Sequence, residues 1–226
     1  MNVITIIPAR GGSKGLKNKN LLKVGRYKLI ERAVITSNQL SFIDKTFVTS
    51  DSSSILNVAK KMHAEIIVRP KYLSKSNSSS ESAILHALKT IKQLYGIMPK
   101  YVCFLQCTSP FILKKDILGA YNKLIKLKYD CIFSVTKNHN NLWNITNNKI
   151  KPVNHNPQKR MMRQDYNKQF NENGAFYIFN TKKFIKYKTR FCNNSSYYET
   201  GYFTNIEIDS LKDLKIANFI SKEFKI

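Results

Sequence analysis

The chain has 226 residues, of which 42% are hydrophobic and 23% are charged. This length and composition are typical of a folded protein of one domain and exclude a disordered or low-complexity chain. The formal net charge of +24 would by itself favour a polyanionic partner. However, only seven of the 38 basic residues are Arg, and the Lys residues are spread along the whole chain. This distribution favours a general lysine enrichment and no nucleic-acid partner.

Predicted strands and helices alternate along most of the chain. Residues 3–8 form a continuous apolar run that ends in proline, the pattern of a central strand buried on both faces. The other predicted strands are 45–50, 64–70, 101–106, 130–136, 174–180 and 203–209, and the predicted helices are 29–35, 53–62, 80–94, 114–127 and 210–224. This alternation predicts βαβ units, and therefore an α/β fold with a mainly parallel sheet flanked by helices.

The alternation is interrupted between residues 138 and 172. This stretch is polar and rich in Asn, and it contains Trp143 and the basic sequence KRMMRQ at 159–164. It is too long for an ordinary loop, so we expect an excursion that is either mobile or docked on another surface. Because no repeat or linker divides the chain, we expect residues 1–226 to form a single domain.

The cysteines and the apolar runs bear on where the protein works. The four cysteines, Cys103, Cys107, Cys131 and Cys192, form no C-x-x-C pair, which favours reduced core thiols over a disulfide or zinc framework. No apolar stretch reaches the roughly 18 residues of a membrane span, and the first residues do not have the pattern of a signal peptide. We therefore expect a cytoplasmic protein that has no contact with a membrane.

The strongest local signal follows the first strand. Ligands of open α/β sheets bind at the carboxyl ends of the strands, and the sequence RGGSKGLKNKN at 10–20 stands there. It is neither a P-loop nor a G-x-G-x-x-G fingerprint. Its three glycines allow backbone N–H groups to approach an anion, and Arg10, Lys14 and Lys19 compensate negative charge. A phosphate loop is therefore favoured over a solvated basic turn.

Other strand ends carry weaker signals. Ser50 and Asp51 follow the second long strand, where caps and turns are the ordinary interpretation. Gln106 and Thr108 follow the strand at 101–106; amide and hydroxyl groups there suit recognition of hydroxyl or carbonyl groups, although a capping turn is an equal alternative.

A pair of carboxylates lies near the end of the chain. Glu207 and Asp209 are two apart on the predicted strand 203–209, so both side chains face the same side and are close enough to share a hard cation such as Mg²⁺. Such pairs are also common on exposed faces. A nearby phosphate loop favours the metal site, because nucleotide triphosphate chemistry needs a cation at the phosphate oxygens.

Taken together, these segments resemble a known family. The segments PARGGSKGLKNKN, VTSD, RP, LQCTSP, RQDYNKQFNENGAFYI and IEIDSLKDL stand in the same order as the signature segments of the acylneuraminate cytidylyltransferases. The resemblance covers residues 3 to about 217 and implies a Rossmann-like nucleotidyltransferase sheet. It also implies a reaction in which the anomeric 2-hydroxyl of N-acetylneuraminate attacks the α-phosphate of CTP, giving CMP-sialic acid and pyrophosphate.

The resemblance implies roles for individual residues. Arg10, Lys19 and Asp209 would be catalytic. The residues that would hold the nucleotide are Arg10, Ser13, Asn20, Arg69, Ser78 and Ser80. The sugar acid would contact Gln106, Arg163 and Tyr177, and Glu207 and Asp209 would bind Mg²⁺ or Mn²⁺. Cations, amides and Mg²⁺ suit phosphoryl-type transfer, which needs positioning and charge neutralisation more than a nucleophilic side chain.

The resemblance also implies a homodimer with shared active sites, in which 138–172 is a dimerisation extension that reaches over the partner's site.

One departure from the family pattern concerns the metal site: Glu207 stands where the family pattern has Asp. The alternatives left open are the same reaction on Kdn, legionaminic acid, pseudaminic acid or Kdo, a non-catalytic relative, and a basic nucleic-acid-binding protein.

Overall fold

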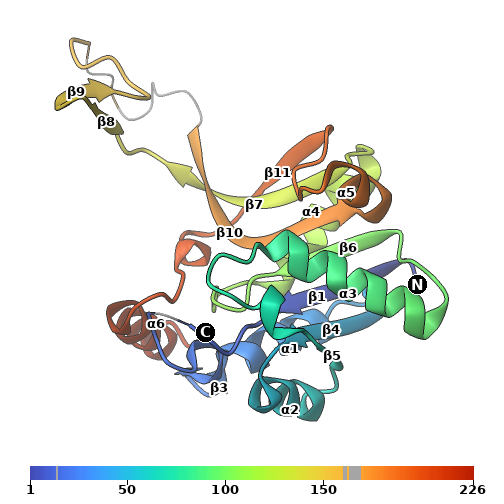
Figure 1. Cartoon of the computed structure of the whole chain (residues 1–226). Helices are drawn as coiled ribbons and strands as arrows, with labels where there is room; N and C mark the ends of the chain where they lie inside the picture. Colours follow the sequence, from blue (N-terminus) through green and yellow to red (C-terminus); the bar gives the residue numbers. More distant parts are fainter. Residues whose placement is uncertain (14, 160–161, 163–168) are drawn as a thin grey trace.

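A seven-stranded sheet with helices on both faces forms the body of the protein (Figure 1). The computed structural model describes residues 1–13, 15–159, 162 and 169–226. The strand order is β11-β7-β10-β6-β1-β4-β5. The strands are β1 (Val3–Pro8), β4 (Lys45–Ser50), β5 (Glu65–Val68), β6 (Tyr101–Leu105), β7 (Cys131–Asn138), β10 (Gln169–Asn180) and β11 (Ser195–Glu199).

Six helices accompany the sheet in the part of the chain that the structure describes. They are α1 (Leu29–Asn38), α2 (Ser53–Lys61), α3 (Ser80–Tyr95), α4 (Lys114–Lys126), α5 (Thr181–Tyr187) and α6 (Leu211–Glu223). Short 3-10 helices span η1 (Lys19–Leu21), η2 (Lys71–Leu73) and η4 (Tyr202–Asn205), and a small hairpin pairs β2 (Lys23–Val24) with β3 (Tyr27–Lys28). None of the helices formed by the described residues is both long and apolar enough to cross a membrane.

The core is divided by the sheet into two apolar layers. Residues of α1, α2, α4 and α6 pack with one set of strand side chains, and residues of α3 and α5 pack with the alternate set. The split follows from the strand period of two, because successive side chains of a buried strand such as β1 point to opposite faces. The predicted α/β fold, with a mainly parallel sheet flanked by helices, is therefore confirmed.

Strand β10 is the exception to the parallel arrangement. It is antiparallel to both β6 and β7, whereas β1, β4, β5, β6 and β7 run in the same direction. A register shift between Glu172 and Tyr177 bends it at Gly174, whose φ of 69° favours glycine. Because β10 is reversed, its first residues lie at the edge of the sheet where β7 and the other strands end.

The predicted strand 203–209 is wrong. The chain forms η4 over Tyr202–Asn205 and then passes 206–209 without joining a sheet. Its backbone makes one bond to a loop, from the N–H of Ile208 to the carbonyl oxygen of Thr108 (2.9 Å). The alternating pattern correctly indicated an extended segment that buries Ile208, but a strand also needs a free neighbouring edge. The strand β11 and the helix α5 were not predicted.

A hairpin projects from the body within the predicted excursion (Figure 1). It pairs β8 (Trp143–Thr146) with β9 (Lys149–Pro152). The register places Trp143 opposite Pro152 and Ile145 opposite Ile150, so one face is apolar, while the alternate pairs are polar. All eight residues are exposed. The excursion leaves and rejoins the body through β7 and β10, at the edge where the parallel strands end.

Candidate active site

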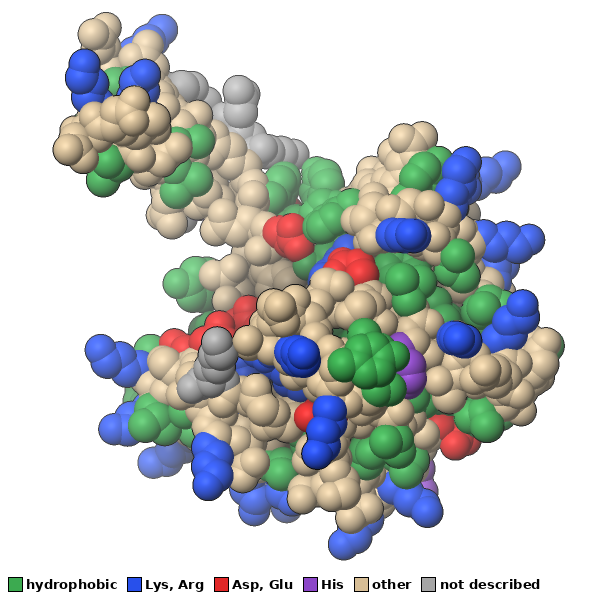
Figure 2. Space-filling view, viewed as in Figure 1, with side chains coloured by type: hydrophobic (Ala, Val, Ile, Leu, Met, Phe, Trp, Pro, Cys, Tyr) green, Lys and Arg blue, Asp and Glu red, His purple; other side chains and the backbone are tan. Residues whose placement is uncertain are grey.

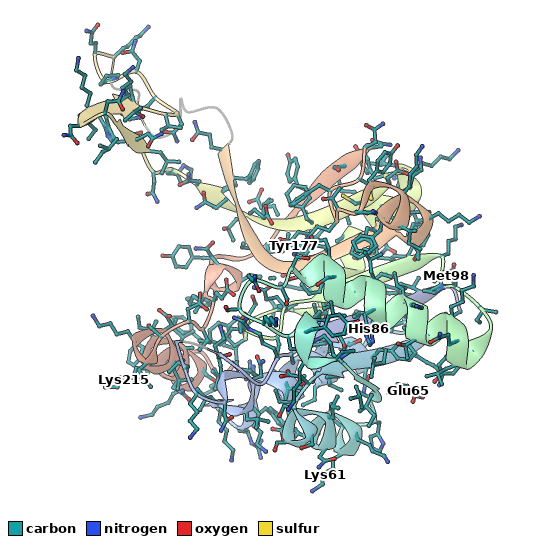
Figure 3. All side chains as sticks on the ribbon, viewed as in Figure 1. Lys61, Glu65, His86, Met98, Tyr177 and Lys215 are labelled. Carbon is teal, nitrogen blue, oxygen red and sulfur yellow. The ribbon has the colours of Figure 1, made fainter. Side chains whose placement is uncertain are left out.

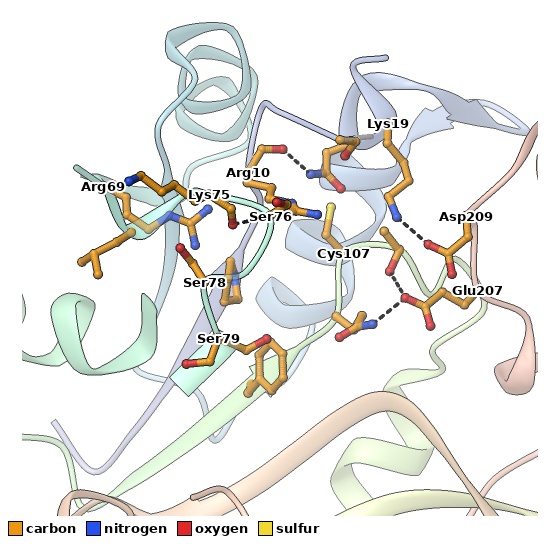
Figure 4. A pocket seen from close by; sticks show the side chains of 18 residues that line it. Arg10, Lys19, Arg69, Lys75, Ser76, Ser78, Ser79, Cys107, Glu207 and Asp209 are labelled. Carbon is orange, nitrogen blue, oxygen red and sulfur yellow. Dashed lines mark hydrogen bonds and ion pairs between the residues drawn. The ribbon is translucent and has the colours of Figure 1, made fainter. Parts of the chain in front are cut away.

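A cavity of about 330 Å³ opens at the carboxyl ends of β1, β5 and β6 (Figure 4). Every predicted site residue except Arg163 and Tyr177 lines it: Arg10, Ser13, Lys19, Asn20, Arg69, Ser78, Ser80, Gln106, Glu207 and Asp209. Arg163 lies outside the residues that the structure describes, as does Lys14. The tertiary fold thus brings together side chains from five separate segments of the sequence.

The loop after β1 is held against the start of α2. The N–H of Gly11 donates to Oδ1 of Asp51 (2.9 Å), and a Cβ at Gly11 would stand 2.9 Å from Cβ of Ser52. Ser52 is the cap of α2, since its Oγ accepts from the N–H of Ile55. The interpretation of Asp51 as a cap is therefore wrong: its carboxylate fixes the loop, and the N–H of Gly11 is already used.

Gly15 brings the same loop against the carboxylate segment. A Cβ added at Gly15 would stand 2.7 Å from the carbonyl oxygen of Asp209, closer than real Cβ contacts allow. Lys19, the first residue of η1, completes this junction with an ion pair from its Nζ to Oδ1 of Asp209 (2.7 Å). Residues from the beginning of the sequence, Gly15 and Lys19, and Asp209 near its end therefore meet at one wall of the cavity.

Asn20 shapes the loop from behind. Its Nδ2 donates to the carbonyl oxygen of Arg10 (3.0 Å), and its side chain is buried. Its Oδ1 has no hydrogen-bond partner among the described residues. Arg10 in turn donates from Nη1 to the carbonyl oxygen of Lys75 (3.0 Å), which links the loop to the segment after β5.

Four cations surround the cavity: Arg10, Lys19, Arg69 and Lys75. Arg69 is 5% exposed, and its Nε has no hydrogen-bond partner among the described residues. Burial lowers the pKa of its guanidinium, while the nearby Asp51 carboxylate opposes that shift and Arg10 adds to it. Such a buried and incompletely bonded cation is suited to an anion or a carbonyl-bearing ring.

The amino end of α3 forms a further wall. Ser78, Ser79 and Ser80 line the cavity, and the Oγ of Ser79 caps the helix by accepting from the N–H of Ser82 (3.1 Å). Sixteen residues of aligned peptide dipoles give this helix start a partial positive charge. The wall therefore adds to the positive potential of the four cations.

The opposite wall carries the two carboxylates. Oε1 of Glu207 accepts from Nε2 of Gln106 (2.6 Å) and from Oγ1 of Thr108 (2.8 Å). Asp209, whose side chain is 67% exposed, has one oxygen on Lys19. Burial of Ile208 between them directs both carboxylates to the cavity. The shared orientation that we predicted for a strand is therefore found on a segment that is not a strand.

Two carboxylates are a small ligand set for a metal. Among the described residues no group of three or more His, Cys, Asp or Glu is placed to hold a metal ion. Mg²⁺ commonly takes only one or two carboxylates and completes its shell with phosphate oxygens and water. Glu207 and Asp209 fit that ion, and they fit a cation that arrives with a phosphate-bearing ligand better than one held by protein alone.

Tyr177 is placed differently from the other predicted residues. It lies on β10, is 2% exposed and stacks on Phe104, with ring centroids 5.5 Å apart (Figure 3). Its hydroxyl donates to Oε1 of Glu172. Burial, together with this carboxylate, raises the pKa of the Tyr177 hydroxyl. Phe104 lines the cavity, so Tyr177 stands one ring behind the wall.

Some residues that line the cavity were not among the predicted site residues. Lys75, Ser76 and Cys107 all line the cavity. The first two follow the strand end at Arg69, which was a usable signal. Cys107 stands within the LQCTSP segment, and burial raises the pKa of its thiol to about 12. It is therefore a neutral thiol at physiological pH and no nucleophile.

Comparison with known proteins places this arrangement in a family. A family model described as cytidylyltransferase matches residues 4–222. The chain belongs to the cytidylyltransferase family. Its relatives include an N-acylneuraminate cytidylyltransferase of Escherichia coli O18:K1:H7, 31% identical over 98% of this chain and 52% of that protein, and N-acylneuraminate cytidylyltransferase A of Danio rerio, 29% identical over 96% and 50%. The chain spans about half the length of these relatives.

Another relative matches the chain over nearly the whole length of both proteins. It is a pseudaminic acid cytidylyltransferase of Campylobacter jejuni, 28% identical over 98% of this chain and 97% of that protein. Among solved structures, a CMP:2-keto-3-deoxy-manno-octonic acid synthetase complexed with CTP superposes with a TM-score of 0.73, at 14% identity, over 99% of this chain and 100% of that one. A 4-diphosphocytidyl-2C-methyl-D-erythritol synthase from Anaerococcus prevotii superposes with a TM-score of 0.70, at 16% identity, over 98% of both chains. These two structures confirm the Rossmann-like nucleotidyltransferase fold.

Proposed function

We propose that this chain transfers CMP from CTP to the anomeric hydroxyl of N-acetylneuraminate, giving CMP-sialic acid and pyrophosphate. The observation that carries the proposal is the division of charge in one cavity. Arg10, Arg69 and Lys75 lie on one side of it, and Glu207 and Asp209, the latter paired with Lys19, form the facing wall (Figure 4). A triphosphate with its cation needs both kinds of group within one site.

The residues divide the work as follows. The sugar hydroxyl oxygen bonds to the α-phosphorus of CTP and its proton is released to solvent, while the bond from that phosphorus to the bridging oxygen breaks and pyrophosphate leaves with the electron pair. Arg10 and Lys19 offset the charge of the phosphates. Ser78, Ser80 and Arg69 bind the cytidine end, and Gln106 binds the sugar acid. Because the cavity excludes bulk water only partly, positioning by these groups supplies most of the effect.

Mg²⁺ is the proposed cofactor, and Mn²⁺ would fit the same oxygen ligands. When bound, the ion supplies neutralisation of the phosphate oxygens. Asp209 and Glu207 would hold it. Their present partners, Lys19 for Asp209 and Gln106 for Glu207, keep the carboxylates oriented towards the cavity.

The identity of the sugar has a strong second candidate. The pseudaminic acid relative covers 97% of its own length, whereas the N-acylneuraminate relatives are about twice as long as this chain. The same cavity would serve pseudaminic acid, Kdn, legionaminic acid or Kdo, since all are 2-keto sugar acids.

A homodimer completes the proposal. The apolar face of the β8–β9 hairpin, with Trp143, Ile145, Ile150 and Pro152, is exposed in the single chain. An isolated two-stranded hairpin with such a face has little stability in water. A second copy would cover that face.

Lys and Arg side chains are distributed around the face shown in Figure 2 and are not gathered in one groove, which supports a small anionic substrate over nucleic acid.

The decisive experiment measures pyrophosphate release from CTP and Mg²⁺ with a panel of 2-keto sugar acids. We expect release with N-acetylneuraminate above all. Arg10→Ala and Asp209→Ala are each expected to lose at least about tenfold in kcat/KM while retaining the fold, because each removes charge from the phosphate and metal sites. Arg26→Ala, an exposed arginine outside the cavity, is the control.

The outcomes separate the alternatives. Release with pseudaminic acid alone would replace the proposed substrate and keep the reaction. No release with any sugar acid would favour a non-catalytic relative, and RNA or DNA binding by that inactive protein would favour the basic nucleic-acid-binding alternative. Full activity of a variant that carries both Arg10→Ala and Asp209→Ala would contradict the assigned roles.

A further inference from the structure

Arg190 packs on the aromatic side chains next to the cavity wall that contains Phe104 and Gln106, although nothing in its local sequence marks it. It follows α5, in the segment that leads to β11. Its Cζ stands 5.0 Å from the ring centroid of Phe104 and 4.7 Å from that of Tyr177. These two rings belong to β6 and β10, paired in register, and Phe104 lines the cavity. Arg190 is therefore next to the strands that carry the proposed sugar contacts.

Glu81 holds the guanidinium in that position. Oε1 of Glu81 accepts from Nε of Arg190 (2.8 Å), and the two side chains are 23% and 16% exposed. Glu81 is the second residue of α3 and follows Ser80, which lines the cavity. The pair thus joins the helix start to the aromatic wall.

The neighbouring residue anchors the segment further. The ring of Phe191 packs edge-on against Tyr177, with centroids 5.8 Å apart, and against Phe133, with centroids 5.2 Å apart. With one aromatic ring locked beside it and a carboxylate on its Nε, Arg190 has little rotamer freedom left to lose when a ligand binds.

Beside this wall Arg190 is more accessible than Tyr177. Tyr177 is 2% exposed and its hydroxyl is used by Glu172, whereas the Arg190 side chain is 16% exposed. A guanidinium has five N–H donors in a fixed plane; Glu81 engages the one on Nε, and the Tyr177 hydroxyl interacts with the same guanidinium. Donors therefore remain for a further acceptor.

The charge of the pair selects the kind of acceptor. Glu81 already neutralises Arg190, so a second carboxylate at this place would bring two negative charges to one cation. A neutral carbonyl oxygen meets no such repulsion and still receives a charge-assisted hydrogen bond. An acylamino group on the sugar ring supplies such a carbonyl oxygen. The oxygen of a ring hydroxyl lies closer to the ring and therefore reaches less far towards the guanidinium.

We propose that Arg190, oriented by Glu81, is a specificity-determining residue that donates a hydrogen bond to the acylamino carbonyl of the sugar acid. This inference rests on the proposed function, because it assigns a part of the sugar to a part of the same cavity. It adds an arginine that sequence motifs did not indicate and leaves the carboxylate of the sugar to other groups.

The test compares N-acetylneuraminate with Kdn, which differ in an acetamido group against a hydroxyl. Arg190→Met keeps an unbranched side chain over the rings and removes the donors. We expect kcat/KM for N-acetylneuraminate to fall about 10- to 100-fold, the loss expected for a hydrogen bond to a charged group, while kcat/KM for Kdn falls less than about threefold and KM for CTP stays unchanged. Arg26→Met is the matched control.

Glu81→Gln provides a second variant that retains size. We expect it to lower the ratio of kcat/KM for N-acetylneuraminate to kcat/KM for Kdn, as Arg190→Met does, but by a smaller factor. A merely structural role would lower the unfolding temperature and reduce both sugars alike, leaving the ratio as in the unaltered protein. That result, or unchanged kinetics of Arg190→Met, would overturn the inference.

Binding measurements separate this inference from the proposed reaction. Saturation-transfer NMR with CMP present reports contact with each sugar whether or not turnover occurs. If N-acetylneuraminate binds and Arg190→Met weakens it selectively, the inference stands even without pyrophosphate release, in which case the proposed reaction fails. If release proceeds but the sugar ratio does not change, the reaction stands and the inference fails. If neither sugar binds, both are contradicted.

Discussion

At the scale of single residues, Gly15 shows how a missing side chain assembles the site. The loop after β1 and the Asp209 segment are far apart in sequence, yet a Cβ at Gly15 would stand 2.7 Å from the carbonyl oxygen of Asp209. Neither partner has a flexible end that can move aside, since the conflicting atom belongs to the backbone. The ion pair between Lys19 and Asp209 depends on the same approach.

Gly15→Ala is therefore expected to separate the two segments. Overpacking of this kind costs about 1–3 kcal/mol of folding free energy, and the cavity wall shifts with it. We expect a lower unfolding temperature and a loss of at least about tenfold in kcat/KM. Gly201→Ala is the control, because a Cβ there meets nothing within 4 Å and its φ is not positive. Equal stability and activity of the two variants would contradict this account.

At the scale of elements, the start of α3 carries a structural and a functional role together. Ser79 caps the helix, while Ser78 and Ser80 on either side line the cavity. Since the unpaired N–H groups of the first turn also provide positive potential, the position of the helix end sets both the stability of α3 and the shape of the site.

Ser79→Ala is expected to remove the cap. The N–H of Ser82 then loses its partner at 3.1 Å, and the free energy of unfolding falls by about 1 kcal/mol, measured by urea denaturation. Ser53→Ala is the comparison, since Ser53 is the exposed first residue of α2 and Ser52 is the cap of that helix. If both variants have the same midpoint, the capping role of Ser79 is refuted.

At the scale of the whole molecule, the β8–β9 hairpin has an apolar face that no other part of the single chain buries, among the described residues. Its apolar face pairs Ile145 with Ile150, which are 71% and 63% exposed. The body has its own two-layered core, so the hairpin is not required to complete it. We therefore assign this face to the proposed dimer.

Replacing Ile145 and Ile150 together by Ser is expected to shift the protein from dimer to monomer in size-exclusion chromatography with light scattering, because the apolar area that drives association is lost. Activity is expected to fall with the dimer if the sites are shared. Replacing Lys149 and Lys151 by Ser, on the opposite face of the same hairpin, should leave the dimer intact. A monomeric unaltered protein with full activity would rule out the shared-site proposal.

The extent to which sequence predicted this protein differs between its parts. The parallel strands were predicted because continuous apolar runs such as Val3–Pro8 have one stable solution, burial on both faces. Strand β11 was missed because its residues alternate weakly in burial and include two serines. The segment 206–209 was predicted as a strand because local pattern fixes an extended backbone but does not specify a pairing partner.

By itself, the sequence determined the α/β fold, because buried strands and amphipathic helices have local patterns, and its resemblance to a known family indicated ten residues that line the cavity. Only the tertiary structure decided that Asp51 fixes the loop, that Tyr177 stacks on Phe104, and that Glu81 holds Arg190 over these two rings. Those contacts join residues that are distant in the chain. They depend on side-chain packing and desolvation between elements, which no local pattern of residues specifies.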